Sequence, residues 1–540
     1  GSGAAVASRM RLCFLGVLLV LAVGCDGAAP TDGGVDAGVV DAAARRDGGP
    51  EMLPDAGSVV MRDVPRAVTV ARATEIPGCD LYVDAASAGT PDGSASNPYP
   101  TITAAVDAAS DGAIICVAEG VYAEFILPAD KAFTLAGGFQ SGQAFTVRDS
   151  AAYVSRAEGD GTGSFIRIEG DVAPRDAQLT AIDGFEITGY ERGVFRATYF
   201  TQRFDITNCY IHDNRCPAGE DRGFGGGFLL GNVSGTIAGN VIRGNTCGFG
   251  GGGAVLGDAP LTTTVVVERN RVEANEGVDT DCHGGGLHLR ASDLVVRGND
   301  FLDNRCTSWG AGLYAGSQPP QRTSARLEWN VYRGNRAGNS GGGFFCDDSA
   351  MCMADHELFD ANCGGNVLLD SGFEPTLPTI ASFDHMTNHG ALDVDCTSPG
   401  PGVIINKESD EANAYTFASS VFWNNGEDVV AACDTGCASL SVDVTYSALR
   451  LSNPGNATVT FGAGNLDAID PRFVDASAGD FHLRSTSGHW TPSGYVSDAE
   501  DSPALRAGDP SGDTSQQPTE AGDRSEMGAY GNSPEASYVN

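Results

Sequence analysis

The segment Ile211-His-Asp-Asn214 is the first of six that share one pattern, in which an apolar residue is followed by two variable residues and then asparagine. The other five are Ile242-Arg-Gly-Asn245, Val272-Glu-Ala-Asn275, Phe301-Leu-Asp-Asn304, Tyr332-Arg-Gly-Asn335 and Phe359-Asp-Ala-Asn362. The asparagines follow one another at intervals of 31, 30, 29, 31 and 27 residues. A fixed period of this length indicates a solenoid, in which each repeat forms one coil and neighbouring coils share a core.

A glycine cluster that leads into an apolar residue follows most of the asparagine segments. The clusters are Gly225-Gly226-Gly227-Phe228, Gly251-Gly252-Gly253-Ala254, Gly284-Gly285-Gly286-Leu287, Gly310-Ala311-Gly312-Leu313 and Gly341-Gly342-Gly343-Phe344. Short alternating strands such as residues 263–267 and 293–296 complete each repeat. A coil of about thirty residues without a helix predicts a right-handed parallel β-helix. A leucine-rich repeat needs a different leucine spacing, and a propeller blade needs about 40 residues.

The repeated asparagine has a physical role in such a coil. Asparagine tolerates left-handed backbone at a turn, and its side-chain amide can bond the equivalent asparagine of the next coil, about 4.8 Å away. We therefore predict an asparagine ladder whose members are Asn214, Asn245, Asn275, Asn304, Asn335 and Asn362.

The predicted fold class is all-β, a parallel β-helix of about thirty-residue rungs with a short N-terminal capping helix. Ile102, Ala105, Val106 and Ala109 have the spacing of one helix face, and a helix there would block edge-to-edge pairing. The predicted organisation is a signal peptide with a lipobox (1–25), a flexible acidic linker (26–75), an N-terminal cap with the first rungs (76–150), β-helix repeats (151–450) and a C-terminal closing segment of the β-helix (451–540).

The charge balance excludes one large class of partners. The 540 residues contain 33 Lys and Arg against 70 Asp and Glu, which gives a formal net charge of -37. Such a surface repels phosphate backbones, so no nucleic acid partner is expected. The chain has two lysines, Lys131 and Lys407, which leaves two places for any mechanism that needs a positioned lysine.

The N-terminus predicts export. Met10 to Cys25 contains a short basic region and an apolar run too short to span a bilayer. Its end, Leu21-Ala22-Val23-Gly24-Cys25, resembles the lipobox of bacterial lipoprotein signal peptides, which implies lipidation of Cys25; an ordinary secretory signal is the alternative. We expect a membrane-anchored lipoprotein at the outer membrane or cell surface, and the sequence leaves open which leaflet carries the anchor.

Three further resemblances concern the fold. Residues 82–109 and 112–122 together look like the N-terminal cap of bacterial pectate-lyase-like parallel β-helix proteins. The glycine clusters paired with apolar-x-x-Asn resemble the repeats of chlamydial polymorphic outer-membrane proteins, which are surface adhesins. The tail from Asp470 to Asn532 is similar to the closing segment of secreted, anchored β-helix lipoproteins.

Export makes disulfides the expected state of most of the 15 cysteines. Cys216 and Cys247 each lie two residues after a ladder asparagine, so they occupy the same place on adjacent rungs and should be bonded. Gly277 occupies that place on the next rung, which favours a second bridge between Cys282 and Cys306. Cys433 with Cys437 and Cys79 with Cys116 are the other expected pairs. Cys209 stands where other rungs have Asn240, Asn270, Asn299 and Asn330, so we expect it to be an unpaired thiol.

The candidate catalytic residues are weak ones. Families of this fold that cleave acidic polysaccharides use clustered aspartates for Ca²⁺ and an arginine or lysine as base, which implies Asp279, Asp281, Arg305 and Arg222 here, with Glu220, Asp221 and His283 nearby. On so acidic a protein these residues are more simply explained as solvated surface. The pairs His385 with His389 and His283 with His288 lack supporting ligands, so no metal site is predicted. Ca²⁺ is the alternative to having no cofactor, and it is expected on the loop of Asp279 and Asp281. Asp347 and Asp348 beside Cys346 could also bind Ca²⁺, but they lack a calcium-loop motif.

Two functions remain as hypotheses. The first is a non-catalytic protein that binds an extracellular polysaccharide or a neighbouring cell-surface component and contacts the membrane through its lipid anchor. The second is a lyase or hydrolase that acts on acidic polysaccharide.

Overall fold

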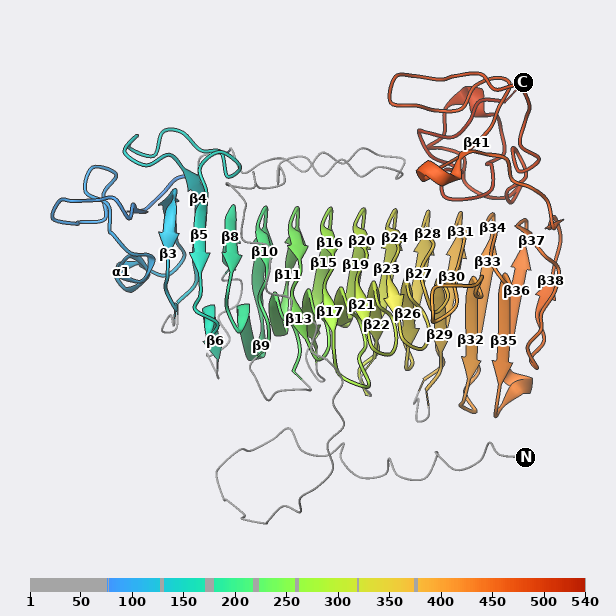
Figure 1. The fold of residues 1–540 in the computed structure, drawn as a ribbon, viewed down its shortest axis with the longest axis horizontal. Helices are drawn as coiled ribbons and strands as arrows, with labels where there is room; N and C mark the ends of the chain where they lie inside the picture. The colour runs from blue at the N-terminus through green and yellow to red at the C-terminus, as the bar shows by residue number, and fades with distance from the viewer. Residues whose placement is uncertain are drawn as a thin grey trace, which may run out of the picture. The chain divides into compact units, whose positions relative to one another are not determined.

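The computed structural model of the chain describes residues 75, 77–126, 131–169, 179–216, 223–257, 262–317, 320–372 and 377–539. These residues form a parallel β-helix, the predicted fold class, whose coils follow one another in chain order (Figure 1). Each complete coil passes through up to four strands, and the equivalent strands of successive coils pair in parallel to form what we call rows 1 to 4. Cys25 and the segments 1–25 and 26–74 lie outside the described residues.

The rows have the following strands. Row 1 contains β6 (Ser164–Glu169), β14 (Gly253–Leu256), β18 (Leu287–Arg290), β22 (Leu313–Gly316), β26 (Phe344–Asp347), β29 (Val367–Asp370), β32 (Val403–Lys407) and β35 (Val429–Cys433). Row 2 contains β1 (Leu81–Val83), β2 (Ala113–Ala118), β4 (Phe133–Phe139), β7 (Leu179–Asp183), β15 (Thr264–Glu268), β19 (Asp293–Arg297), β23 (Ser324–Glu328), β27 (Met351–Asp355), β30 (Ile380–Asp384), β33 (Ala414–Ala418), β36 (Ser441–Thr445) and β38 (Thr460–Phe461). The long strands β9 (Arg192–Thr207) and β11 (Phe228–Ala238) belong to both rows.

Rows 3 and 4 consist of shorter strands. Row 3 contains β3 (Gly120–Tyr122), β5 (Ser155–Glu158), β8 (Phe185–Thr188), β10 (Tyr210–His212), β12 (Val241–Arg243), β16 (Arg271–Glu273), β20 (Asp300–Leu302), β24 (Val331–Arg333), β28 (Leu358–Asp360), β31 (Thr387–His389), β34 (Val421–Trp423), β37 (Ala448–Leu449) and β39 (Leu466–Asp467). Row 4 contains β13 (Thr246–Cys247), β17 (Glu276–Gly277), β21 (Arg305–Cys306) and β25 (Arg336–Ala337).

One coil shows why this sequence forms the fold. Leu287 and Leu289 of β18, Leu294 and Val296 of β19, and Phe301 of β20 are all fully buried. They alternate with residues that point outward, so each short strand contributes one or two side chains to a continuous core. A single coil could not bury these side chains by itself, which is why the repeats must stack.

The predicted asparagine ladder is present in the structure. In its middle, Asn304 accepts hydrogen bonds from the backbone N–H and the amide of Asn275, at 3.1 and 3.0 Å, and its own amide donates to Asn335 and to the carbonyl of Val272. The expected left-handed asparagine is wrong, however. The positive φ belongs to the preceding residue, as in Asp213, Ala274, Asp303 and Ala361, because the asparagine must face inward to reach the next rung.

A second ladder runs one corner away. The N–H of Cys209 donates to Asn240, and Asn240, Asn270, Asn299 and Asn330 then bond one another in the same way. On the next rung Glu357 replaces the asparagine, and its carboxyl accepts from the backbone and the amide of Asn330. Glu357 is fully buried, and this burial raises its pKa well above the ordinary value.

We expect Glu357→Gln to stabilise the protein at neutral pH. The raised pKa means that the folded state holds a proton that the unfolded state releases, so the contribution of Glu357 to stability is present below its unfolded pKa and is lost as the pH rises through its folded pKa. A neutral amide can accept the same hydrogen bonds at every pH. Urea unfolding at several pH values should show a higher free energy of unfolding for the variant at neutral pH and a shallower decline above pH about 5. An unchanged pH profile would contradict this prediction.

The described residues contain six disulfides. Four are the pairs expected from the sequence, Cys79–Cys116, Cys216–Cys247, Cys282–Cys306 and Cys433–Cys437. The other two, Cys346–Cys352 and Cys363–Cys396, have no counterpart in the sequence predictions. Cys209 is unpaired and buried, and the missing Cβ of Gly277 leaves room for the Cys282 sulfur.

The C-terminal segment differs from the expected closing segment. Strands β38 and β39 still pair with β36 and β37, so the solenoid continues beyond residue 450. Residues 468–539 then fold back onto the side of row 3, where they include the hairpin of β40 (Phe473–Asp475) and β41 (Asp480–Leu483) (Figure 1). We call residues 468–539 the C-terminal module. The reason is that Val331, Leu358, Val421 and Ala448 make the outer side of row 3 apolar, and Phe481, Met527 and Tyr530 of the module bury it.

The predicted capping helix is present as α1 (Ile102–Ala108), with Ile102, Ala105 and Val106 buried. Lys131 donates to the carbonyls of Val106, Asp107 and Ala109, and Lys407 donates to the carbonyl of Glu411. Both lysines of the chain therefore bind backbone carbonyls. No helix among the described residues has the length and apolar character needed to cross a membrane.

Candidate functional site

An aromatic residue stands directly before most of the glycine clusters, and the coils stack these residues in one line. Phe224 pairs with Phe249, and His283 pairs with Trp309, through isolated parallel bridges between rungs. Neighbouring ring centroids lie 4.9 Å apart for Phe224 and Phe249, 5.9 Å for Phe249 and His283, and 5.3 Å for His283 and Trp309. All four rings are partly exposed. They form a continuous strip across four rungs.

A second aromatic layer lies beneath this strip. His288, Tyr314 and Phe345 occupy the same outward-facing position on β18, β22 and β26, and each is 3% exposed. His288 stacks on Tyr314 at 4.5 Å, and Tyr314 contacts Phe345 at 5.3 Å. His283 of the outer strip lies 4.8 Å from Tyr314. The two layers together form what we call the aromatic face of row 1.

The histidines of the aromatic face are neutral at pH 7. Burial and the nearby Arg290 lower the pKa of His283 to about 4, and the same two causes lower that of His288 well below its usual value. His288 donates from Nδ1 to the carbonyl of His283, while its Nε2 is buried without a hydrogen-bond partner. The guanidinium of Arg290 lies 5.6 Å from the ring centroid of Phe224. The face is thus aromatic and uncharged apart from Arg290 at its border.

Carboxyl groups lie beside the aromatic face. They occupy the next outward-facing position along the row 1 strands. Asp347 ends β26, Asp370 ends β29, and Asp348 and Glu408 lie in the adjoining turns. We call these four residues the acidic cluster. The hydroxyl of Tyr314 donates to Asp347 at 3.3 Å, which joins the cluster to the aromatic face.

The acidic cluster holds its protons more tightly than ordinary carboxyls. Burial, and then the charges of Asp348 and Asp370, raise the pKa of Asp347 well above its usual value. Burial raises the pKa of Asp370 to about 6, and it also raises those of Asp348 and Glu408. A carboxyl with such a pKa can donate a proton near neutral pH, which is what a general acid does.

The residues named from the sequence are distributed differently. Asp279 and Asp281 lie in the loop that leads to His283, where Asp279 is 6% exposed and accepts the N–H of Asp281 at 2.9 Å. Arg305 is exposed on β21 of row 4, level with Glu276 and Arg336 on the neighbouring rungs. Arg222, together with Glu220 and Asp221, lies outside the described residues. Of the residues named with these candidates, His283 lies on the aromatic face, and the loop of Asp279 and Asp281 leads to it.

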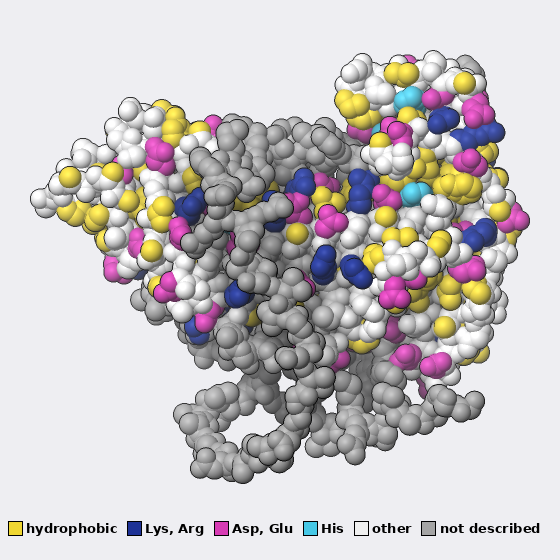
Figure 2. Space-filling view, in the orientation of Figure 1, with side chains coloured by type: hydrophobic (Ala, Val, Ile, Leu, Met, Phe, Trp, Pro, Cys, Tyr) yellow, Lys and Arg dark blue, Asp and Glu magenta, His cyan; other side chains and the backbone are white. Residues whose placement is uncertain are grey.

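Charged residues elsewhere on the coils form pairs rather than a site. Arg243 lies 3.5 Å from Glu273, and Arg333 lies 2.9 Å from Asp360, each on the next rung. Figure 2 shows basic and acidic side chains next to one another on the face that it views. The arginines of both pairs are partly exposed to solvent, and ion pairs open to solvent contribute about 0–1 kcal/mol each.

Sequence reasoning missed Trp309, Tyr314, Phe345 and Arg290. A signal for the outer strip was present, because an aromatic residue precedes the first glycine of four clusters: Phe224-Gly225, Phe249-Gly250, His283-Gly284 and Trp309-Gly310. The inner layer has no such signal, since it depends on which face of each row 1 strand points outward.

Comparisons with known proteins give two matches. Residues 445–508 match a protein family described as disaggregatase related. A crystal structure of pectate lyase Pel9A aligns with 84% of this chain and 97% of its own, at 13% sequence identity and a TM-score of 0.36. No curated protein matches the chain.

Proposed function

We propose that this chain is an exported, lipid-anchored β-helix protein that binds a neutral extracellular polysaccharide along the aromatic face of row 1. The observation that carries the proposal is the strip of partly exposed rings across four rungs, Phe224, Phe249, His283 and Trp309. Sugar rings present apolar C–H faces that pack on aromatic rings, and a strip repeated at each rung suits a polymer. The net charge of -37 and the neighbouring acidic cluster favour a neutral chain over a polyuronate.

Trp309→Ala should weaken polysaccharide binding on the order of tenfold, because Trp309 presents the largest ring of the strip and such anchors dominate binding energy. Affinity electrophoresis of the full chain in gels that contain single neutral polysaccharides measures the effect. Tyr210→Ala removes a half-buried ring from row 3 and serves as the matched control, with no change in mobility expected. If the gel retarded Trp309→Ala and Tyr210→Ala equally, the aromatic face would not be the binding site.

In this proposal, a lipid on Cys25 attaches the protein to the membrane. Cys25→Ser should release the protein from the membrane fraction, because the apolar run before it is too short to span a bilayer. Fractionation of cells that express either form provides the measurement. Continued tight membrane association of the variant would argue against lipidation at this residue.

A second candidate function is cleavage of the bound polysaccharide, by hydrolysis or elimination. It is favoured by Asp370, whose pKa of about 6 suits a general acid, beside the aromatic face. The full chain should be incubated with neutral polysaccharides and, with Ca²⁺, with polyuronates, while reducing ends and unsaturated products are followed. Activity that is lost in Asp370→Asn and kept in Asp303→Asn, an exposed control, would support catalysis. If the chain bound polysaccharide without forming any product, the result would support binding alone and contradict catalysis.

A further inference from the structure

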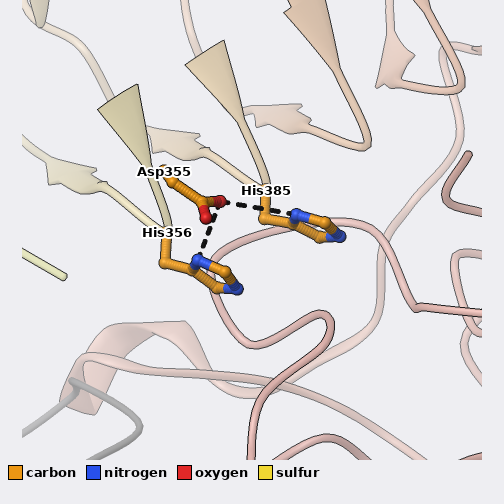
Figure 3. Close-up of side chains that lie close together, drawn as sticks. All are labelled: Asp355, His356 and His385. Carbon is orange, nitrogen blue, oxygen red and sulfur yellow. Dashed lines mark ion pairs between the residues drawn. The ribbon is translucent and has the colours of Figure 1, made fainter. Parts of the chain in front are cut away.

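Two histidines and an aspartate from adjacent rungs meet at the turn between rows 2 and 3. Asp355 ends β27 and His356 follows it, while His385 follows β30 at the same position one rung later. Figure 3 shows both rings directed toward the carboxylate of Asp355. The Oδ1 atom of Asp355 lies 2.8 Å from Nδ1 of His356 and 3.6 Å from Nδ1 of His385. One ligand atom from each of the three residues lies within 4.8 Å of the others.

The far side of each ring is held by the C-terminal module. The Nε2 atom of His356 lies 2.6 Å from the carbonyl oxygen of Gly531, and Nε2 of His385 lies 3.1 Å from the hydroxyl of Ser525. A carbonyl can only accept a hydrogen bond, so Nε2 of His356 carries a proton and the neutral ring presents a lone pair at Nδ1. Trp329 stacks on the ring of His356 at 3.6 Å and fixes its orientation.

The three converging atoms form ion pairs, because Oδ1 of Asp355 lies close to Nδ1 of both rings, but these contacts lack the geometry of hydrogen bonds. His356 and His385 are each 4% exposed, yet Nδ1 of His356, Nδ1 of His385 and Oδ1 of Asp355 are buried without a hydrogen bond. Buried polar atoms without a hydrogen bond cost free energy, and this cost is larger for Nδ1 of His356, whose lone pair faces the carboxylate of Asp355. A cation at the centre of the three atoms would satisfy all of them.

We propose that Asp355, His356 and His385 form a zinc site. Imidazole nitrogens and carboxylate oxygens are ordinary Zn²⁺ ligands, whereas Ca²⁺ and Mg²⁺ prefer oxygen alone. Histidines that bind a metal through one ring nitrogen usually donate the other N–H to a carbonyl or another polar group, which is the arrangement that Gly531 and Ser525 provide.

The structure also offers a solvent-exposed side from which the ion can enter, and a fourth ligand. The side chain of Asp355 is 49% exposed and that of Asp384 is 47% exposed, so the site is open to solvent on their side. Oδ1 of Asp384 lies 3.3 Å from Nδ1 of His385, close enough to complete a four-coordinate site in place of water. Because a Zn–N bond measures about 2.0–2.1 Å, the two nitrogens close slightly on the ion.

Zinc at this position would join the coils to the C-terminal module, since the same imidazoles bind the ion on one side and Gly531 and Ser525 on the other. The site is therefore structural, and it is separate from the aromatic face proposed above for polysaccharide. Anything that binds only the folded state raises its stability by mass action.

The test uses the full chain without a polyhistidine tag, stripped of metal with a chelator. Titration calorimetry with Zn²⁺ should show one ion bound per chain, and Ca²⁺ should produce no binding at these residues. Cobalt substitution should give the visible absorption of a tetrahedral site. Zinc should also raise the unfolding temperature.

Asp355→Ala changes a half-exposed side chain and should weaken zinc binding by at least about tenfold, as should His385→Ala. The control is His212→Ala, because His212 also lies beside two carboxylates, Asp213 at 2.8 Å and Glu186 at 3.2 Å, but has no second histidine. Its zinc binding should match that of the wild type. The proposal is overturned if the wild-type chain neither binds Zn²⁺ nor shows the cobalt spectrum. It is also overturned if binding is unchanged in Asp355→Ala and His385→Ala.

Discussion

Replacing Asn304 with leucine should lower the free energy of unfolding by about 4 kcal/mol, the largest effect that we expect from one substitution. Asn304 is fully buried and takes part in hydrogen bonds to Asn275, Asn335 and Val272. Leucine fills a similar space, but it leaves the N–H of Asn275 and one of its two amide hydrogens without partners, and the carbonyl of Val272 loses the bond from the Asn304 amide. Each buried group left in this state costs about 1–3 kcal/mol.

Urea unfolding of the full chain, followed by tryptophan fluorescence, measures this loss as a lower midpoint. The matched control is Asn339→Ala, because Asn339 is an exposed asparagine of the next coil whose amide bonds only the hydroxyl of Ser308. We expect less than about 1 kcal/mol for the control. A comparable small loss in Asn304→Leu would mean that the ladder contributes little to stability.

Gly252→Ala should cost about 3 kcal/mol, the second largest effect. A Cβ atom at this position would lie 2.6 Å from the carbonyl oxygen of Gly286 on the next rung and 3.1 Å from the side-chain amide of Asn275. The first contact is with backbone, so the coils would have to move apart. That movement would also strain the ladder bond of Asn275.

Thermal unfolding compares this variant with Gly78→Ala, whose added Cβ would meet nothing within 4 Å. The control should unfold at the wild-type temperature or slightly above it, because alanine restricts the unfolded chain. If Gly252→Ala were equally stable, the coils would be looser at this corner than the structure indicates.

The two substitutions explain why the two sequence motifs occur together. One glycine of each cluster packs against a ladder asparagine: Gly227 against Asn245, Gly252 against Asn275, Gly286 against Asn304, Gly312 against Asn335 and Gly343 against Asn362. The amide needs the space that a side chain would occupy. The glycine clusters and the ladder asparagines therefore contact each other in the folded chain, although about twenty residues separate them in the sequence.

Much of the fold could be predicted because its determinants are local and repeated. The period of the apolar-x-x-Asn segments predicted the stacked coils, and the position of Cys216 and Cys247 relative to the ladder predicted their pairing. The bridge of Cys346 with Cys352 could not be predicted in this way, because neither cysteine stands at a recognisable place in the repeat. Cys363 directly follows the ladder asparagine Asn362, but its partner Cys396 has no recognisable place in the repeat, so this bridge could not be predicted either.

The site was less predictable, because its parts come from different positions in the repeat. Asp279, Asp281 and Arg305 were chosen for their charge in one or two loops, whereas the aromatic face combines loop residues such as Trp309 with strand residues such as Tyr314. The stacking of coils brings these two positions together across rungs, as in the contact of His283 with Tyr314.

By itself, the sequence determined the all-β solenoid, the register of its rungs, its capping helix and four of its disulfides, since all of these follow from short motifs at a constant period. The tertiary structure alone decided which outward positions form the aromatic face, where the C-terminal module docks, and that His385 meets His356 instead of His389. The physical reason is that these contacts join residues across rungs, or across more than a hundred residues of chain. No local spacing encodes such contacts.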